Sequence, residues 1–319
     1  MCRPNRGKPV QGSPRRKHSL LLTTESFRCN DFVFKKDDDD RSEWVGAPTV
    51  GSTLMTVAAI VVAFFGIEHG LRYVFQALKD SHYLLENETN RHVLSRHIGV
   101  DALACLAVGY VGIKNLHIMD DLKNHTLRRS KSMVETDYEK RLFTYHPAAQ
   151  QVLLLFFSYQ VKNMYDTIVW NDGIIFIIHH LLSGAAAWGG MYPGAAHFYA
   201  IFYMGISEIS TAILCLLANF DDEFGVVGLG DAFPITRAAL GVIFAVAFII
   251  CRATIWPIVT YHLFKDSIQA LKSESSKYRS KDKWIKIFMF TSSALSILQV
   301  LWLGEIIVTV KTEVEKLLV

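Results

Sequence analysis

Two adjacent histidines, His179 and His180, lie inside an apolar stretch that covers residues 173–188. Carboxylates occur on the apolar segments to either side, with Asp166 before the doublet and Glu208 after it. An ionisable side chain inside a lipid-length apolar helix is costly, about 2.5 kcal/mol or more for a charged group at the bilayer centre. These groups therefore need partners within the protein, or a chemical use.

Three kinds of chemistry can use this set. A histidine beside a carboxylate can act as a general base, or as a nucleophile in acyl transfer. Two histidines and two carboxylates can bind a metal ion, but adjacent histidines chelate one ion poorly. The same buried groups can also form a proton or ion pathway. Spacing alone does not choose among these, although two rings about 100° apart on a helix cannot share one role. We expect one ring to face inward and the other to donate to a backbone carbonyl.

Other polar residues recur at helical spacing within the apolar segments, so each set is expected to share one helix face that points into a bundle. Lys162 lies four residues before Asp166, and the two are expected to pair. Ser, Thr and Gln within a span more often bond a neighbouring helix than a ligand. The clearest stripe consists of His197, Met204, Glu208, Thr211, Cys215 and Asn219.

Two charged positions are expected to find partners in the same way. Glu68 and Arg72 are four residues apart and could neutralise each other near a membrane face. Arg252 lies deep in an apolar segment, where it can serve as a counter-ion for Glu208 or Asp166, or can extend its charge to the interface.

The composition favours a membrane protein. Of the 319 residues, 51% are hydrophobic and 12% aromatic, and the mean hydropathy is +0.23. Such values exceed those of ordinary soluble domains. The formal net charge of +3 does not point to nucleic acid. The five cysteines show neither metal-type spacing nor a disulfide framework.

Seven apolar runs, each near the ~20 residues that a bilayer requires, predict an all-α polytopic membrane protein. A polar tail, residues 1–48, cannot bury enough apolar surface to fold and is expected to be disordered. Residues 49–80 hold the first transmembrane helix, residues 91–310 the main domain, and residues 311–319 a short tail. The expected spans are 53–77, 97–116, 149–168, 173–190, 196–219, 237–262 and 284–310.

Lys and Arg concentrate in the tail and in the connections 114–147 and 265–286. Because positive charge marks the cytosolic side, this pattern places the N-terminus in the cytosol. Two glycosylation sequons, at Asn87 and Asn124, lie on opposite sides of the second span. A glycan on Asn87 would support this orientation, and one on Asn124 would reverse it.

The order of these polar motifs resembles that of the TLC-domain proteins, the membrane family shared by ceramide synthases and translocating-chain-associating proteins. The resemblance covers about residues 91–305. It is carried by Asn90-Arg91-His92-Val93-Leu94-Ser95-Arg96-His97, Tyr159 with Asp166, His179-His180, Ser207-Glu208-Ile209-Ser210-Thr211, Asn219, Arg252 before Pro257, and Leu298-Gln299-Val300-Leu301-Trp302.

The resemblance implies six helices around a cavity open to the membrane, with an additional helix ahead of them. It also implies a lipid-related function in the endoplasmic reticulum or another endomembrane, with membrane lipids as partners. The membrane orientation that it implies is opposite to the one inferred from the Lys and Arg distribution. No metal is expected. Ceramide synthases follow the doublet with a histidine and two aspartates, where this chain has Ile206, Ser207 and Ser210. The pattern therefore looks closer to the non-synthase branches of the family.

Our leading hypothesis is a protein of membrane-lipid homeostasis that binds or senses a lipid or acyl chain in an intramembrane cavity. The alternative is a sphingoid-base N-acyltransferase in which His179 and His180 are catalytic and fatty acyl-CoA is the co-substrate, with Glu208 in place of the missing aspartates. A third class is a partner of translocation or sorting machinery, for which no specific feature is found. The residues expected to line the cavity are Asp166, Ser207, Glu208, Thr211, Asn219, Arg252, Gln299 and Trp302.

Overall fold

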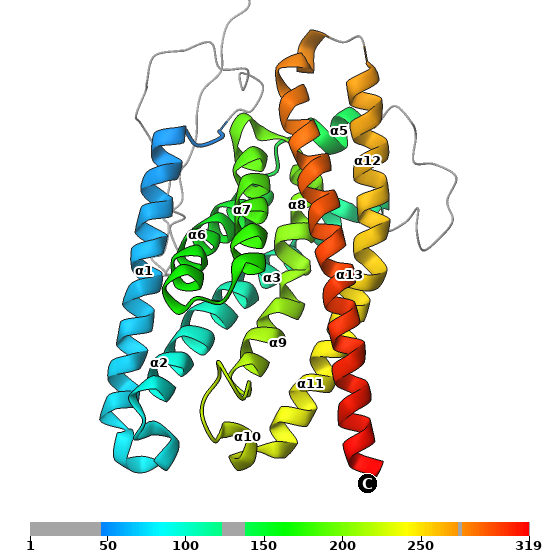
Figure 1. Cartoon of the computed structure of the whole chain (residues 1–319). Coiled ribbons are helices and arrows are strands. Elements are labelled where there is room, and N and C mark those ends of the chain that lie inside the picture. Colours follow the sequence, from blue (N-terminus) through cyan, green and yellow to red (C-terminus); the bar gives the residue numbers. More distant parts are fainter. Residues whose placement is uncertain (1–45, 123–137, 274–275, 319) are drawn as a thin grey trace, which may run out of the picture. The chain divides into compact units, whose positions relative to one another are not determined.

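A computed structural model describes residues 46–122, 138–273 and 276–318 (Figure 1). Within these ranges the regular elements are all helical, which confirms the predicted all-α class. The predicted tail lies almost entirely outside the described residues, as does the sequon at Asn124. The α-helices are α1 Val50–Ala77, α2 Glu88–Arg96, α3 Leu103–Lys114, α5 Tyr138–Phe143, α6 Pro147–Trp170, α7 Ile174–Gly189, α8 His197–Ile201, α9 Glu208–Ala218, α10 Leu229–Ala232, α11 Pro234–Phe248, α12 Trp256–Lys272 and α13 Asp282–Leu318.

Among the described residues, six continuous helical stretches are long and apolar enough to cross a membrane. They correspond to six of the seven predicted spans, so the chain is an integral membrane protein. Several combine two α-helices through a π-helical segment. The six stretches are Val50–Ala77, Glu88–Lys114, Ile174–Tyr192, His197–Ala218, Pro234–Lys272 and Arg279–Thr312.

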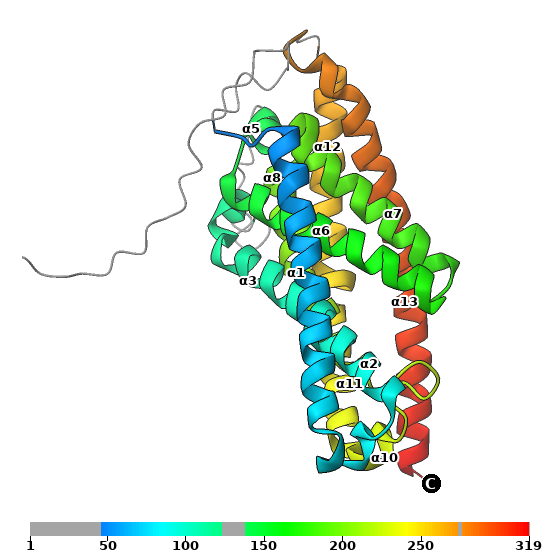
Figure 2. The same ribbon diagram turned by 90° about the vertical axis from the view of Figure 1, so that its left-hand side faces the viewer.

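The remaining predicted span, 149–168, is helix α6. It has 24 residues, enough to cross a bilayer, but it is not among the six apolar stretches. Its buried residues include Gln160, Lys162 and Asp166. Helices α1, α3, α7 and α8 pack against α6, and Figure 2 shows α1 crossing in front of it. These neighbours give the polar groups of α6 protein partners in place of lipid.

Local sequence determines where α6 begins and ends and where α7 begins. Pro147 begins α6, where the missing N–H leaves no hydrogen bond unmade. Asn171 ends it in the left-handed conformation (φ 57°), and Gly173 precedes α7 at φ 109°, which side chains rarely tolerate. The two helices therefore run antiparallel and in contact, and they bring the histidine doublet beside the middle of α6.

Helix α3 approaches the π-helical segment Phe202–Ile206 very closely. A Cβ atom added to Gly112 would lie 2.8 Å from the backbone nitrogen of Ile206. This contact sets the position of the chain just before Glu208. The π-helical segment also shifts the helical phase, so the predicted stripe from His197 to Asn219 does not follow one uninterrupted α-helix.

Arg252 lies in another π-helical segment, Ile249–Ile255. Pro257 follows at the start of α12 and cannot donate the hydrogen bond that the preceding turn requires. A widened turn accommodates this loss, and such segments are frequent at functional sites.

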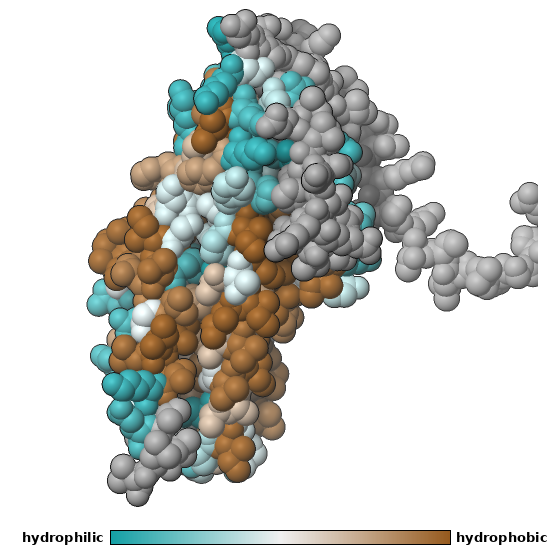
Figure 3. Space-filling view, turned by 90° about the vertical axis from the view of Figure 1, so that its right-hand side faces the viewer, coloured by the Kyte–Doolittle hydropathy of each residue, from teal (hydrophilic) through white to brown (hydrophobic). Residues whose placement is uncertain are grey.

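The outward side of α13 is apolar. Ile297, Val300, Leu301, Ile307 and Val308 are each more than half exposed, and Figure 3 shows apolar side chains over much of this face. A large exposed apolar surface on helices of membrane length is expected where lipid replaces water as the solvent.

Candidate functional site

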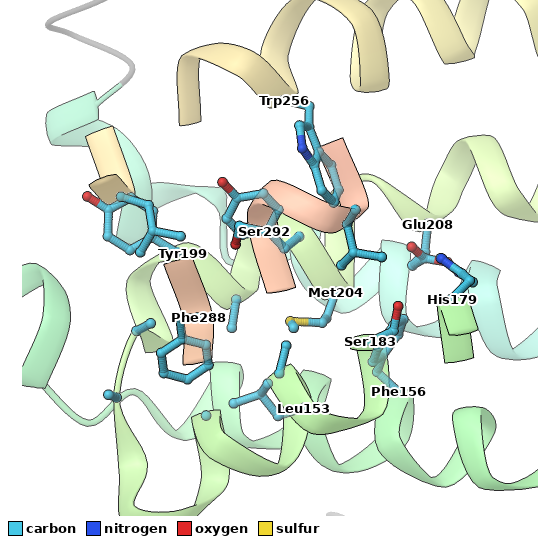
Figure 4. Close-up of a pocket in the computed structure, with 18 of the residues that line it drawn as sticks. Leu153, Phe156, His179, Ser183, Tyr199, Met204, Glu208, Trp256, Phe288 and Ser292 are labelled. Carbon is cyan, nitrogen blue, oxygen red and sulfur yellow. The ribbon is translucent and has the colours of Figure 1, made fainter. Parts of the chain in front are cut away.

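A pocket lies among α6, α7, α8, α9, α12 and α13. It contains about 600 Å³ of space between atoms, including the part that is open to the surroundings. Its two ends differ in chemistry (Figure 4). His179, Ser183 and Glu208 gather at one end, Phe288 and Tyr199 lie toward the other, and the remaining walls are mostly apolar.

Arg252 organises the polar end of the pocket. Its Nη2 donates to Glu208 Oε1 at 2.8 Å and to Thr211 Oγ1 at 2.8 Å. The same nitrogen reaches the carbonyl oxygen of Ser207 at 3.2 Å, and Nε donates to Ser210 Oγ at 3.3 Å. Of the two counter-ions that the sequence left open, the structure selects Glu208. Both members of this ion pair are about 93% buried.

One nitrogen of the Arg252 guanidinium, Nη1, takes no part in these hydrogen bonds. It lies over the ring of Trp256, with Cζ 5.3 Å from the ring centroid. Within the described part of the chain, its Nη1 donates to no acceptor. Because Arg252 lines the pocket, this nitrogen can donate to a ligand oxygen while Nη2 and Nε hold the group in place.

The two histidines of the doublet have different surroundings. His180 Nδ1 bonds Gln160 Oε1 at 2.7 Å, and because a carbonyl oxygen only accepts, Nδ1 is the donor. The expectation that one ring donates to a backbone carbonyl is therefore wrong; α6 supplies a side chain instead. His179 lines the pocket and meets the ring of Trp302 edge-on at 5.3 Å between centroids. Its Nδ1 is buried and has no hydrogen-bond partner among the described residues.

Gln299 lies on α13 between Leu295, which lines the pocket, and Trp302, which contacts His179. Its side chain is 95% buried, and neither amide atom has a partner in the described structure. Unpaired buried polar atoms are rare in native proteins and need an explanation, such as a ligand or water. Gln299 and His179 thus present unused donors and acceptors near the polar end of the pocket.

The other predicted cavity residues lie elsewhere. Ser207 donates to the carbonyl of Tyr203, and Asn219 donates to the carbonyls of Cys215 and Leu216 in its own helix. Thr211 supports Arg252 and does not line the pocket.

Asp166 belongs to a separate charge network between α1, α2 and α6. It pairs with Lys162, as predicted, and Lys162 also bonds Glu68 at 2.6 Å. The expected Glu68–Arg72 pair is wrong, because Arg72 pairs with Glu88 at 2.7 Å. The long-range contact with Lys162 takes Glu68 into the protein interior, whereas Arg72 stays at the surface.

Sequence reasoning missed several residues of the pocket wall. Ser183 is a small polar residue without a distinctive spacing, so no signal singled it out. Ser292 has helical spacing to Ser296 and Gln299, but it was not among the predicted cavity residues. Tyr199 lines the apolar end, and its hydroxyl donates to Asp266, which also accepts two bonds from Arg141. This buried cluster fixes α5, α8 and α12 to one another.

Within the described ranges, no group of three or more His, Cys, Asp or Glu side chains is arranged to hold a metal ion.

A bundle of membrane-length apolar helices around a pocket with one polar end defines a polytopic integral membrane protein with an internal pocket. Residues 99–308 match the family model of the TLC domain, which covers well over half of the chain. The protein belongs to the TLC-domain family. No curated protein and no solved structure matches the chain. Helices α1 and α2 precede the matched region, which begins slightly later than the predicted domain, 91–310.

Proposed function

We propose that this protein binds a membrane lipid in the pocket and acts in the homeostasis or sensing of membrane lipids, in the endoplasmic reticulum or another endomembrane. The observation that carries the proposal is the contrast between the two ends of the pocket. One end offers the free Nη1 of Arg252 and the free Nδ1 of His179, and the other is lined by apolar and aromatic side chains. Such a gradient matches a molecule with a polar group and a hydrocarbon chain.

The charge balance at the polar end of the pocket limits which lipids can bind there. Arg252 and Glu208 neutralise each other at 2.8 Å, and the other polar lining groups are histidine, serine and tyrosine side chains. A charged lipid group would add an uncompensated charge to this buried site. We therefore propose that the buried polar group of the ligand is uncharged, with a carbonyl oxygen for Arg252 and a hydroxyl or amide for His179.

Lipids that co-purify with the protein test this proposal. The Ala186→Leu variant places three extra heavy atoms against the pocket wall, and the neighbouring Ala185→Leu variant places them on the exposed side of α7. Mass spectrometry of protein purified in detergent should find a bound lipid in wild type and in Ala185→Leu, and much less in Ala186→Leu. Equal lipid in all three proteins, at matched thermal stability, would contradict binding in this pocket.

A second candidate function is N-acyl transfer to a long-chain base, with fatty acyl-CoA as the co-substrate. The position of His179 favours it, because this histidine lines the pocket and its Nδ1 has no hydrogen-bond partner among the described residues. Such a nitrogen can accept a proton from an amine or attack a thioester. Against it, Glu208 is already engaged by Arg252, whereas a catalytic histidine needs an orienting partner.

Single histidine variants distinguish the two candidates. Purified protein is supplied with a long-chain base and fatty acyl-CoA of several chain lengths, beside His179→Ala and His180→Ala. An amide product that His179→Ala abolishes, and that His180→Ala only reduces, would establish the enzyme. Absence of any histidine-dependent product, together with a co-purified lipid, would leave lipid binding as the function.

A further inference from the structure

The charge network outside the pocket contains more acids than bases. Lys162 is completely buried and contacts Glu68 at 2.6 Å and Asp166 at 2.5 Å. Arg96 is 93% buried and pairs with Asp172 at 2.6 Å. These contacts set two fixed cations against three carboxylates, and the network holds one carboxylate more.

That additional carboxylate is Asp101, which lies in the π-helical segment His97–Ala102 and is 96% buried. Its Oδ2 is 3.8 Å from Arg96 Nε, too far for a hydrogen bond. Its Oδ1 is buried and has no partner among the described residues. Asp166 Oδ2 is 3.9 Å from the same Arg96 nitrogen, so Asp101 and Asp166 share a long ion pair with Arg96, and Asp101 makes no hydrogen bond with it.

The charge count does not balance even with histidine included. His92 Nε2 lies 3.4 Å from Glu68 and could supply a third cation when protonated. Four carboxylates would still face three cations. Buried negative charge in excess of the neighbouring positive charge is strongly unfavourable in the membrane interior, and a carboxylate lowers this cost by binding a proton.

We propose that Asp101 is a proton-binding site, with the proton on Oδ1 and with Oδ2 directed toward the Arg96 guanidinium. The inference does not depend on what the pocket binds. The network also joins α1, which precedes the matched TLC domain, to α6 within it. Neutral Asp101 lowers the surplus of negative charge in this network by one.

Every helix packed around Asp101 contributes groups that affect its proton. Through Cys105, whose thiol donates to Glu208 Oε2 at 3.7 Å, the network also borders the wall of the pocket. The ionisable groups around Asp101 are Glu68 on α1, His92 and Arg96 on α2, His97 beside it, Cys105 on α3, Tyr159, Lys162 and Asp166 on α6, Asp172 after α6, and Glu208 and Cys215 on α9.

Infrared spectroscopy of the full-length protein in lipid nanodiscs tests the site directly. We expect wild type to show, at neutral pH, the carbonyl stretch of a protonated carboxylic acid, and we expect this band to fade as the pH is raised. Asp101→Asn should lack the band. Asp231→Asn, which changes an exposed aspartate on α10, should keep it. Removal of the band by Asp166→Asn but not by Asp101→Asn would overturn the assignment.

Thermal unfolding gives an independent readout. The folded protein would hold a proton that the unfolded chain releases at neutral pH, so raising the pH should oppose folding. We expect wild type to lose several degrees of melting temperature as the pH rises from about 4, near the ordinary pKa of an unfolded aspartic acid, to about 9. Asp101→Asn should match wild type at the lower pH and exceed it at the higher one. Equal destabilisation of Asp101→Asn at both pH values would show that the charged carboxylate is required, and would refute the proposal.

Discussion

The polar end of the pocket and the charge network both bury charged side chains, but they offset the cost of burial in different ways. In the pocket, one cation meets one carboxylate, and Thr211 and Ser210 accept further bonds from Nη2 and Nε of Arg252. In the network, Lys162 is shared by two carboxylates and Asp101 is left over. A balanced pair can border an open cavity, because it needs nothing further for neutrality. A cluster with surplus acid must take up a proton to remain buried.

The largest effect is expected from Lys162→Met, which breaks the network. It leaves Glu68 and Asp166 facing each other without a cation, and we expect a loss of about 5 kcal/mol in the free energy of unfolding, at the upper end for a broken buried ion pair. Denaturant titration in detergent micelles measures it. Adding Asp166→Asn should restore part of the loss, and Lys79→Met, on an exposed residue, should change little. A single variant as stable as wild type would mean that lipid or water reaches this region.

Arg252→Met breaks the pocket pair and should cost about 3 kcal/mol, because Glu208 is left as an unpaired buried carboxylate. The double variant Arg252→Met, Glu208→Gln removes both charges and should recover most of the stability. Unfolding of the two variants under identical conditions gives the comparison. Lipid binding should stay low in both, since the donor at Nη1 is lost. If the double variant regained the bound lipid, Arg252 would not be a ligand-binding group.

Gln299→Leu separates stability from function at a position near the polar end of the pocket. An unpaired buried amide is unfavourable, so leucine should raise the free energy of unfolding of the lipid-free protein by about 1 kcal/mol. The amount of co-purified lipid should fall at the same time. Thermal unfolding before and after delipidation separates the two effects. A loss of stability in the lipid-free state would indicate that Gln299 has a structural partner.

The smallest expected effect is the pH response of His146, which precedes α6 and lies outside both charged regions. Burial lowers the pKa of His146 below its usual value of 6.5, so folding favours the neutral ring. Its contribution to stability is full above about pH 6.5 and declines as the pH falls below that value. His146→Gln should reduce this loss of stability at acidic pH, which is measured as the change of melting temperature with pH. The sign is opposite to that expected for Asp101, so the two contributions can be distinguished in one titration.

Much of the fold could be predicted because its signals are local. Apolar runs of bilayer length give the helices, and turn residues such as Gly173 give their ends. The Lys162–Asp166 pair follows from a spacing of four within one helix. The family could be predicted as well, since the polar motifs occur in a fixed order along the chain.

The site itself depended on contacts between helices, which spacing does not determine. Glu68 takes a partner 94 residues away in place of Arg72, because α1 packs against α6. The doublet gave no reason to prefer His179 for the pocket, and only the register of α7 on α6 directs His180 to Gln160. The π-helical segment Phe202–Ile206 shifts the phase ahead of Glu208, so a face drawn from ideal periodicity misplaces its polar residues.

The sequence alone determined that this chain folds as membrane-length helices and that ionisable groups lie within them, because hydrophobic periodicity and length act residue by residue. Only the tertiary structure decided how these groups divide into a neutral pair beside a pocket and an acid-rich network around Asp101. The physical reason is that the charge balance of a buried site is a sum over several helices. It exists only once those helices have packed.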